Sequence, residues 1–156
     1  MCWTWPRRCE VTAVHERSIL LRAYDDEQAE VERALERILS AARRKAVDEL
    51  ESLHAFGPKF TKYDDFEPLG RQDADTTKRL EREAITGVKA FVPDVEDVKI
   101  DVFGPVAVAT FVMNYDVVTE EDERLSFRAR STMVFARDEG RWLIVHEHFS
   151  PFTSNG

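Results

Sequence analysis

The order of the periodic segments is the feature that most constrains how this chain can fold. Apolar residues recur at helical spacing over residues 25–56, in two consecutive amphipathic pieces, and Gly57-Pro58 ends that stretch. A third helix is predicted within residues 73–91, and Pro93 marks the end of the helical half. Between the helices, residues 59–66 alternate in a way that is consistent with a short strand or an extended loop.

Strand patterns occupy the rest of the chain, with predicted strands at residues 95–104, 106–119, 125–137 and from Arg141 onward. Short connections join them, so they are expected to form an antiparallel meander. Helices followed by such a meander predict an α+β fold. A sheet with helices on one face must curl around them, and a curled sheet leaves a pocket on its concave side.

Composition limits the partners that the chain can have. The 30 acidic residues outnumber the 22 basic ones, and the resulting net charge of −8 argues against nucleic acid or an anionic membrane as a partner. No apolar run approaches the roughly 20 residues that span a bilayer. Cys2 and Cys9 both precede the periodic region, so no disulfide framework is expected, and a reducing cytoplasm is the expected location.

The first 24 residues stand apart from these patterns. They lack the charge order and the small-residue cleavage site of a secretory signal. We therefore expect residues 1–24 to form a flexible N-terminal arm and residues 25–156 to form one domain.

The last predicted hairpin carries a column of polar side chains. If the connection before Arg141 is a three-residue turn with Gly140 in the left-handed conformation, Thr132 faces His146 and Arg130 faces His148. A two-residue turn would shift the register by one and pair the polar column with apolar residues, so we favour the three-residue turn, which separates the two faces better. Side chains alternate between the two faces of a strand. One face is then expected to carry Arg128, Arg130, Thr132, Trp142, Ile144, His146, His148 and Ser150, and the other Phe127, Met133, Phe135, Leu143, Val145 and Phe149.

Two interpretations of the polar column remain open. In the first, the apolar face covers the core and the polar face meets solvent or a dimer partner. In the second, both faces are buried, and the polar column lines a cavity. Trp142 and Ile144 favour the second interpretation, because a face in water rarely needs them.

The same hairpin resembles the C-terminal end of SnoaL-like proteins in the nuclear transport factor 2-like superfamily. The resemblance rests on Arg130-Ser131-Thr132, Gly140-Arg141-Trp142 and His148-Phe149-Ser150. The closest branch is the one related to the association domain of calcium/calmodulin-dependent kinase II. The resemblance implies a cone-shaped α+β fold, a cystatin-like roll in which a curved antiparallel sheet wraps round N-terminal helices. It also implies a deep pocket and a homodimer joined through the outer face of the sheet.

The resemblance does not imply a single activity, since the superfamily holds isomerases, cyclases, dehydratases and non-catalytic assembly domains. We expect either a small-molecule-binding protein, with acid–base chemistry as one option, or a non-enzymatic oligomerisation or ligand-sensing module. The expected ligand is a small anionic or carbonyl-containing molecule. Tyr63, Asp64, Asp65, Tyr115 and Asp116 have the residue types of an isomerase site, but their spacing selects none of them.

Roles can be assigned to the polar column under the small-molecule hypothesis. Arg130 would hold a carboxylate or an enolate oxygen, and His146 or His148 would transfer the proton. The remaining expected binding residues are Thr132, Ser150, Tyr63, Tyr115 and Trp142.

No metal or cofactor is expected. The two histidines at i and i+2 resemble half of a metal site, but the sequence offers no evident third ligand. A phosphate-binding glycine loop does not occur either. The apolar face of the hairpin predicts a homodimer through the sheet, because such a face would otherwise lie in water.

Overall fold

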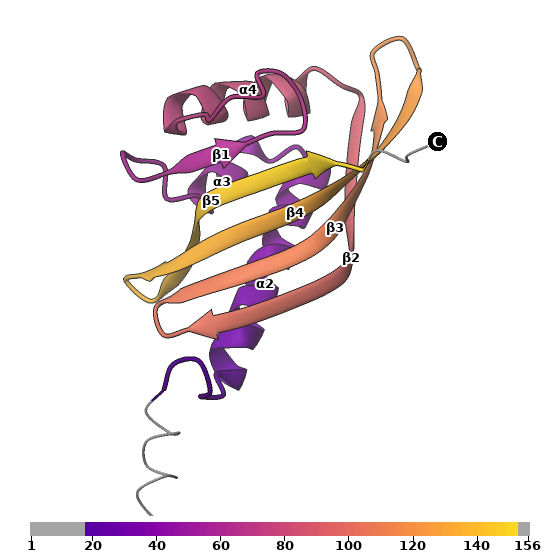
Figure 1. Cartoon of the computed structure of the whole chain (residues 1–156). Helices are drawn as coiled ribbons and strands as arrows, with labels where there is room; N and C mark the ends of the chain where they lie inside the picture. The colour runs from indigo at the N-terminus through magenta and orange to yellow at the C-terminus, as the bar shows by residue number, and fades with distance from the viewer. Residues whose placement is uncertain (1–17, 153–156) are drawn as a thin grey trace, which may run out of the picture.

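The computed structural model describes residues 18–152, and its fold is the predicted α+β arrangement (Figure 1). Three helices are present in this range: α2 (Asp25–Arg43), α3 (Val47–Ser52) and α4 (Ala74–Thr86). The five strands are β1 (Thr61–Tyr63), β2 (Ala90–Phe103), β3 (Val106–Val118), β4 (Arg124–Asp138) and β5 (Arg141–Pro151). They form one curved sheet in the order β1-β5-β4-β3-β2.

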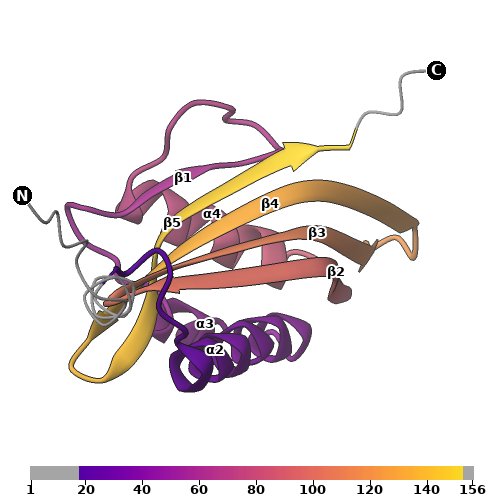
Figure 2. The ribbon, with the colours of Figure 1, turned by 60° about the horizontal axis from the view of Figure 1, so that its bottom comes forward.

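Helices α2 and α3 lie against one face of the sheet (Figure 2). Their apolar stripes, predicted from the helical spacing, are buried there together with the inward side chains of β3 and β4. On α2 the stripe consists of Val31, Leu35, Ile38, Leu39, Ala41 and Ala42. The helices therefore cover the concave face and leave the convex, outer face to the surroundings.

Three details differ from the sequence predictions. β1 pairs in parallel with β5, so the meander gains a parallel edge strand. β2 begins at Ala90 and runs through Pro93, which is tolerated because β2 is the other edge of the sheet and needs no N–H on its free side. A bulge between Glu96 and Lys99, with Asp97 at φ 53°, then bends this strand.

The predicted hairpin register is wrong. The turn contains two residues, Glu139 at φ 46° and Gly140 at φ 76°, instead of three. Two positive φ angles define the tight turn whose twist suits a hairpin. A bulge beyond Phe135 then shifts the pairing, so that Thr132 faces His148 and Arg130 faces Ser150.

This bulge also changes which side chains share a face. Trp142 and Ile144 lie on the buried inner face, not in the polar column, while Leu143 and Val145 lie on the outer face. Met133 and Phe135 are 1% and 0% exposed because the rest of the chain covers them. Of the apolar face from which the homodimer was predicted, Met133 and Phe135 are thus covered within one chain, whereas Leu143 and Val145 are half-buried on the outer face.

The N-terminal arm, predicted over residues 1–24, lies outside the described residues up to position 17. Of the part that is described, Tyr24 packs against the core, and the Arg22 guanidinium lies 5.0 Å from the centre of its ring. Helix α2 begins at Asp25, as predicted. Within residues 18–152, no helix is long and apolar enough to cross a membrane.

Candidate functional site

A cavity of about 510 Å³ lies between the concave face of the sheet and the helices. Its size is in the range of small-molecule sites. Most of its wall is apolar, with Ile38, Leu39, Ala42, Leu80, Ala84, Ile85, Phe91, Met113, Met133 and Phe149. Its polar end is built from His54, Lys62, Asp64, Gln72, Glu81 and Glu147.

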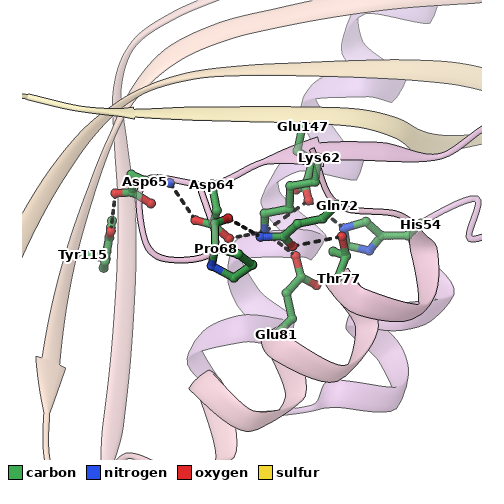
Figure 3. A network of polar contacts seen from close by, with 10 residues as sticks. All are labelled: His54, Lys62, Asp64, Asp65, Pro68, Gln72, Thr77, Glu81, Tyr115 and Glu147. Atoms are coloured by element: carbon green, nitrogen blue, oxygen red, sulfur yellow. Dashed lines mark hydrogen bonds and ion pairs between the residues drawn. The ribbon is translucent and has the colours of Figure 1, made fainter. Parts of the chain in front are cut away.

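The polar end joins four separate elements (Figure 3). Lys62 on β1 pairs directly with Glu147 on β5, so the parallel register places both side chains on the inner face. Glu81 reaches them from α4, and His54 follows α3. Backbone bonds between Leu53, Ala55 and Ile144 fix the His54 segment against β5.

Lys62 is the central cation of this cluster, and its side chain is 6% exposed. Its Nζ lies 2.7 Å from Glu81 Oε1, 3.3 Å from Asp64 Oδ2 and 3.5 Å from Glu147 Oε2. Burial opposes its charge, but the neighbouring carboxylates, with Glu147 first, raise the pKa of Lys62 well above its usual range. Lys62 is therefore a cation at neutral pH.

His54 and Glu147 form a second ion pair beside it. His54 Nδ1 donates to the Leu50 carbonyl at 2.9 Å, and Nε2 lies 3.5 Å from Glu147 Oε2. Burial lowers the pKa of His54, but the Glu147 charge outweighs it and raises the value to about 9. Burial has the opposite effect on the carboxyl group of Glu147 and raises its pKa. The positive charges of Lys62 and His54 outweigh this effect and lower the pKa of Glu147 to about 2.

Three buried atoms of the polar end have no hydrogen-bond partner among the described residues. They are His54 Nε2, Glu81 Oε2 and Glu147 Oε2. Burial raises the pKa of Glu81, and Lys62 only partly offsets this. Since an unsatisfied buried polar atom costs free energy, a polar ligand group that bonds these atoms would be stabilised there.

The same three residues offer the donor types of a metal site, with ligand atoms within 4.8 Å of one another. The Lys62 ammonium lies beside two of them, so a doubly charged metal ion would meet stronger repulsion there than a singly charged or neutral ligand group. We therefore treat the cluster first as a site for a polar ligand group.

A second polar pair lies farther along the cavity wall. The Tyr115 hydroxyl donates to Asp65 Oδ2 at 2.6 Å (Figure 3). Burial raises the pKa of Asp65, although the Tyr115 hydrogen bond counteracts it, and burial together with Asp65 raises the pKa of Tyr115. Phe66, Phe91 and Phe127 pack around the Tyr115 ring.

The residues of the predicted polar column lie elsewhere. Arg130, Thr132, His148 and Ser150 line a separate hollow of about 490 Å³ on the outer face of the sheet. Arg130 donates to Ser150 at 3.3 Å, and its guanidinium lies 5.6 Å from the Phe152 ring centre. His146 bonds Thr61 at 2.8 Å.

Of the predicted aromatic walls, Tyr63 contacts both outer histidine rings and is 39% exposed. Trp142 lies on the inner face and donates to Glu30 on α2 at 2.9 Å, which ties the sheet to the helix. Tyr115 is the aromatic residue from the predicted set that lines the cavity.

The sequence interpretation missed His54, Lys62, Glu81 and Glu147. A usable signal existed for Glu147, which the alternation placed on the same face as Phe149. A carboxylate on an apolar face needs a buried partner. That partner, Lys62, lies 85 residues earlier along the chain, and only the parallel β1–β5 pairing brings the two together.

Comparison with known proteins agrees with this fold. A family model described as a SnoaL-like domain matches residues 31–154. No curated protein matches the sequence. Among solved structures, a nuclear transport factor 2-like superfamily protein from Salmonella enterica is similar at 18% identity and a TM-score of 0.75, over 86% of this chain and 96% of that one.

Two further structures carry more specific descriptions. A candidate dehydratase of the same superfamily from Streptomyces avermitilis has 18% identity and a TM-score of 0.75, over 85% of this chain and all of that one. The CaMKII association domain of C. elegans has 16% identity and a TM-score of 0.66, over 80% and 95%. At such identities these likenesses show the fold alone.

Proposed function

The chain belongs to the SnoaL-like domain family, and on that premise we propose that it binds a small, largely apolar molecule in the cavity and moves a proton on it with Asp65. Isomerases, cyclases and dehydratases use this type of acid–base step. The apolar wall would hold the body of the ligand, and the polar end would orient it.

The observation that carries the proposal is the Tyr115–Asp65 pair at the cavity wall. A carboxyl group whose pKa is raised by burial holds a proton closer to neutral pH, which suits proton transfer. The Tyr115 hydroxyl, with its raised pKa, stays protonated. When a ligand oxygen takes the place of Asp65 as the acceptor, this hydroxyl can stabilise negative charge that develops on that oxygen, in the way of an oxyanion hole.

Hydrogen–deuterium exchange on small ketones used as probe substrates tests this proposal. Small bicyclic ketones such as 2-tetralone would be incubated with the protein in D₂O, and α-proton exchange followed by NMR. We expect the wild-type protein to accelerate exchange and Asp65→Asn to lose at least tenfold of that acceleration. Asp116→Asn is the control, because Asp116 is exposed and accepts a hydrogen bond from Ser126. Exchange at the buffer rate with every ketone would contradict the proposal.

A second candidate function is assembly, favoured by the outer face of the sheet. Val108, Val134, Leu143 and Val145 are only half-buried there, and the hollow beside Arg130 continues this surface. We propose that this face joins two copies, with Arg130, His146 and His148 acting at the interface or on an anion bound there. Light scattering at micromolar concentration should return twice 18.0 kDa. A monomer for the wild type would contradict the assembly proposal.

A further inference from the structure

We propose that the polar end of the cavity is a receptor for a primary ammonium group, so that the ligand is a primary amine on a compact apolar body. The inference rests on the proposed function, because it names the ligand class of the same cavity. It follows from a comparison of the polar atoms of the wall that already have a partner in the protein with those that have no hydrogen bond.

Apart from the His54 Nε2 proton, which faces Glu147 at 3.5 Å, the main hydrogen-bond donors of the cavity wall face acceptors of the protein itself. Lys62 Nζ donates to Glu81 Oε1 at 2.7 Å and lies 3.3 Å from Asp64 Oδ2 and 3.5 Å from Glu147 Oε2. Tyr115 donates to Asp65, and the Gln72 amide donates to the Pro68 carbonyl at 3.4 Å. A ligand carboxylate would thus have to displace an existing partner from one of these donors.

The open atoms are acceptors or can become acceptors. Glu81 Oε2 and Glu147 Oε2 are buried carboxylate oxygens without a hydrogen bond, and Glu147 Oε2 lies 3.5 Å from both Lys62 Nζ and His54 Nε2. His54 Nδ1 keeps its proton because it donates to the Leu50 carbonyl, which leaves Nε2 to accept when the ring is neutral. Three acceptors within 4.8 Å of one another match the three N–H bonds of one ammonium group.

The charges favour the same ligand. With His54 neutral, the polar end holds the carboxylates of Asp64, Glu81 and Glu147 against the single cation of Lys62. Asp65, Glu67 and Glu83 add further acidic groups to the wall. In a partly dry cavity such charges attract a cation and repel an anion.

In the free protein, His54 is protonated at neutral pH, since its pKa is about 9. An incoming ammonium group therefore takes the place of the His54 proton between the same carboxylates. Below pH 9 this exchange releases one proton, so the affinity for an amine should rise about tenfold per pH unit. The affinity for a neutral ligand should stay unchanged.

Four adamantane derivatives test the inference, because they share one apolar body and differ in the polar group. These are 1-adamantanamine, its N,N,N-trimethyl derivative, 1-adamantanol and 1-adamantanecarboxylate. We expect calorimetry at pH 7 to show that the amine binds at least tenfold more tightly than the alcohol. The carboxylate should bind more weakly than the alcohol. The trimethyl derivative should lose at least tenfold against the amine, because it has no N–H. The affinity of the amine alone should rise between pH 7 and pH 8.

Paired variants locate the effect. Glu81→Gln should lower the affinity for the amine at least tenfold and the affinity for the alcohol less than threefold. Glu96→Gln, a matched change at an exposed carboxylate paired with Arg128, should alter neither. If Glu81→Gln does not fold, the order of the four affinities for the wild-type protein still decides whether the polar end binds an ammonium group.

The outcomes separate this inference from the proposed function. An amine that binds no tighter than the alcohol, or no tighter than its trimethyl derivative, overturns the ammonium receptor and leaves the cavity as a binding site. Failure of all four compounds, the neutral alcohol included, counts against the proposed function itself.

Discussion

The two faces of the β4–β5 hairpin carry similar residue types in opposite settings. On the inner face, Glu147 is buried and lies within 3.5 Å of both Lys62 and His54. On the outer face, His148 and Arg130 are exposed beside Thr132 and Ser150. One short segment, His146-Glu147-His148, therefore contributes to two different surfaces.

The difference shows that residue type alone does not identify a site. Solvent screens the outer charges, and an exposed ion pair contributes at most about 1 kcal/mol. The inner charges have lost their water, so each requires a specific partner, and the loss of one leaves another uncompensated. Perturbed pKa values accordingly cluster in the cavity, at His54, Glu81, Glu147 and Asp65.

Removal of the inner cation should have the largest effect. Lys62→Met leaves the buried carboxylates of Glu81 and Glu147 without their main partner. We expect a loss of about 3–5 kcal/mol in the free energy of unfolding, measured with denaturant. A loss below about 1 kcal/mol would mean that water reaches the cluster and that the contrast between the faces is false.

The pH dependence of stability should come next. The pKa of His54 is raised to about 9, so its stabilising contribution is complete below pH 6.5 and is lost as the pH rises through 9. The pKa of Glu147 is lowered to about 2, so its contribution is present above pH 4.5 and is lost as the pH falls towards 2.

The comparison of wild type with His54→Gln isolates the alkaline branch. The difference in unfolding free energy should be on the order of 3 kcal/mol at pH 6 and should shrink towards pH 10. His148→Gln on the outer face is the matched control and should follow the wild-type curve. A His54→Gln curve parallel to the wild type from pH 6 to pH 10 would refute the buried ion pair.

A smaller effect is expected at the cavity wall. Tyr115→Phe removes the hydrogen bond to Asp65 at a cost of about 1 kcal/mol. Because that bond holds the Asp65 pKa down, the variant should raise it further, which carbon-detected NMR of the carboxyl group can follow. An unchanged titration of Asp65 would show that the pair is not formed in solution.

The outer face should give the smallest effect. Arg130 is exposed and forms one long hydrogen bond to Ser150, so Arg130→Met should change the unfolding free energy by less than about 0.5 kcal/mol. This would be measured on the monomer at high dilution, so that assembly does not contribute. A loss of stability comparable to that of Lys62→Met would contradict the assignment of the buried charge network to the inner face.

Much of the fold could be predicted because local patterns determine it. In α2 the spacing of the apolar residues predicts which side chains are buried, and in β3 and β4 the alternation of side chains does the same. The hairpin register was not predictable in the same way. The bulge between Val134 and Phe135 and the two-residue turn each shift the pairing, and together they move Trp142 and Ile144 to the inner face.

The candidate site was harder to predict than the fold, since it depends on contacts between distant segments. Lys62, Glu81 and Glu147 come from a short edge strand, a helix and the last strand. Each of them alone has an ordinary interpretation as a surface charge. Tyr115 and Asp65 had been recognised as suitable residue types, but only the folded chain shows that these two meet.

A crystal structure of the protein soaked with 1-adamantanamine tests the central claim most directly, namely that the cavity and not the outer hollow is the ligand site. The account predicts the adamantane cage among Ile38, Leu39 and Met133, with its nitrogen within hydrogen-bond distance of Glu81 and Glu147. An empty cavity, with the compound bound instead on the outer face beside Arg130, would contradict it.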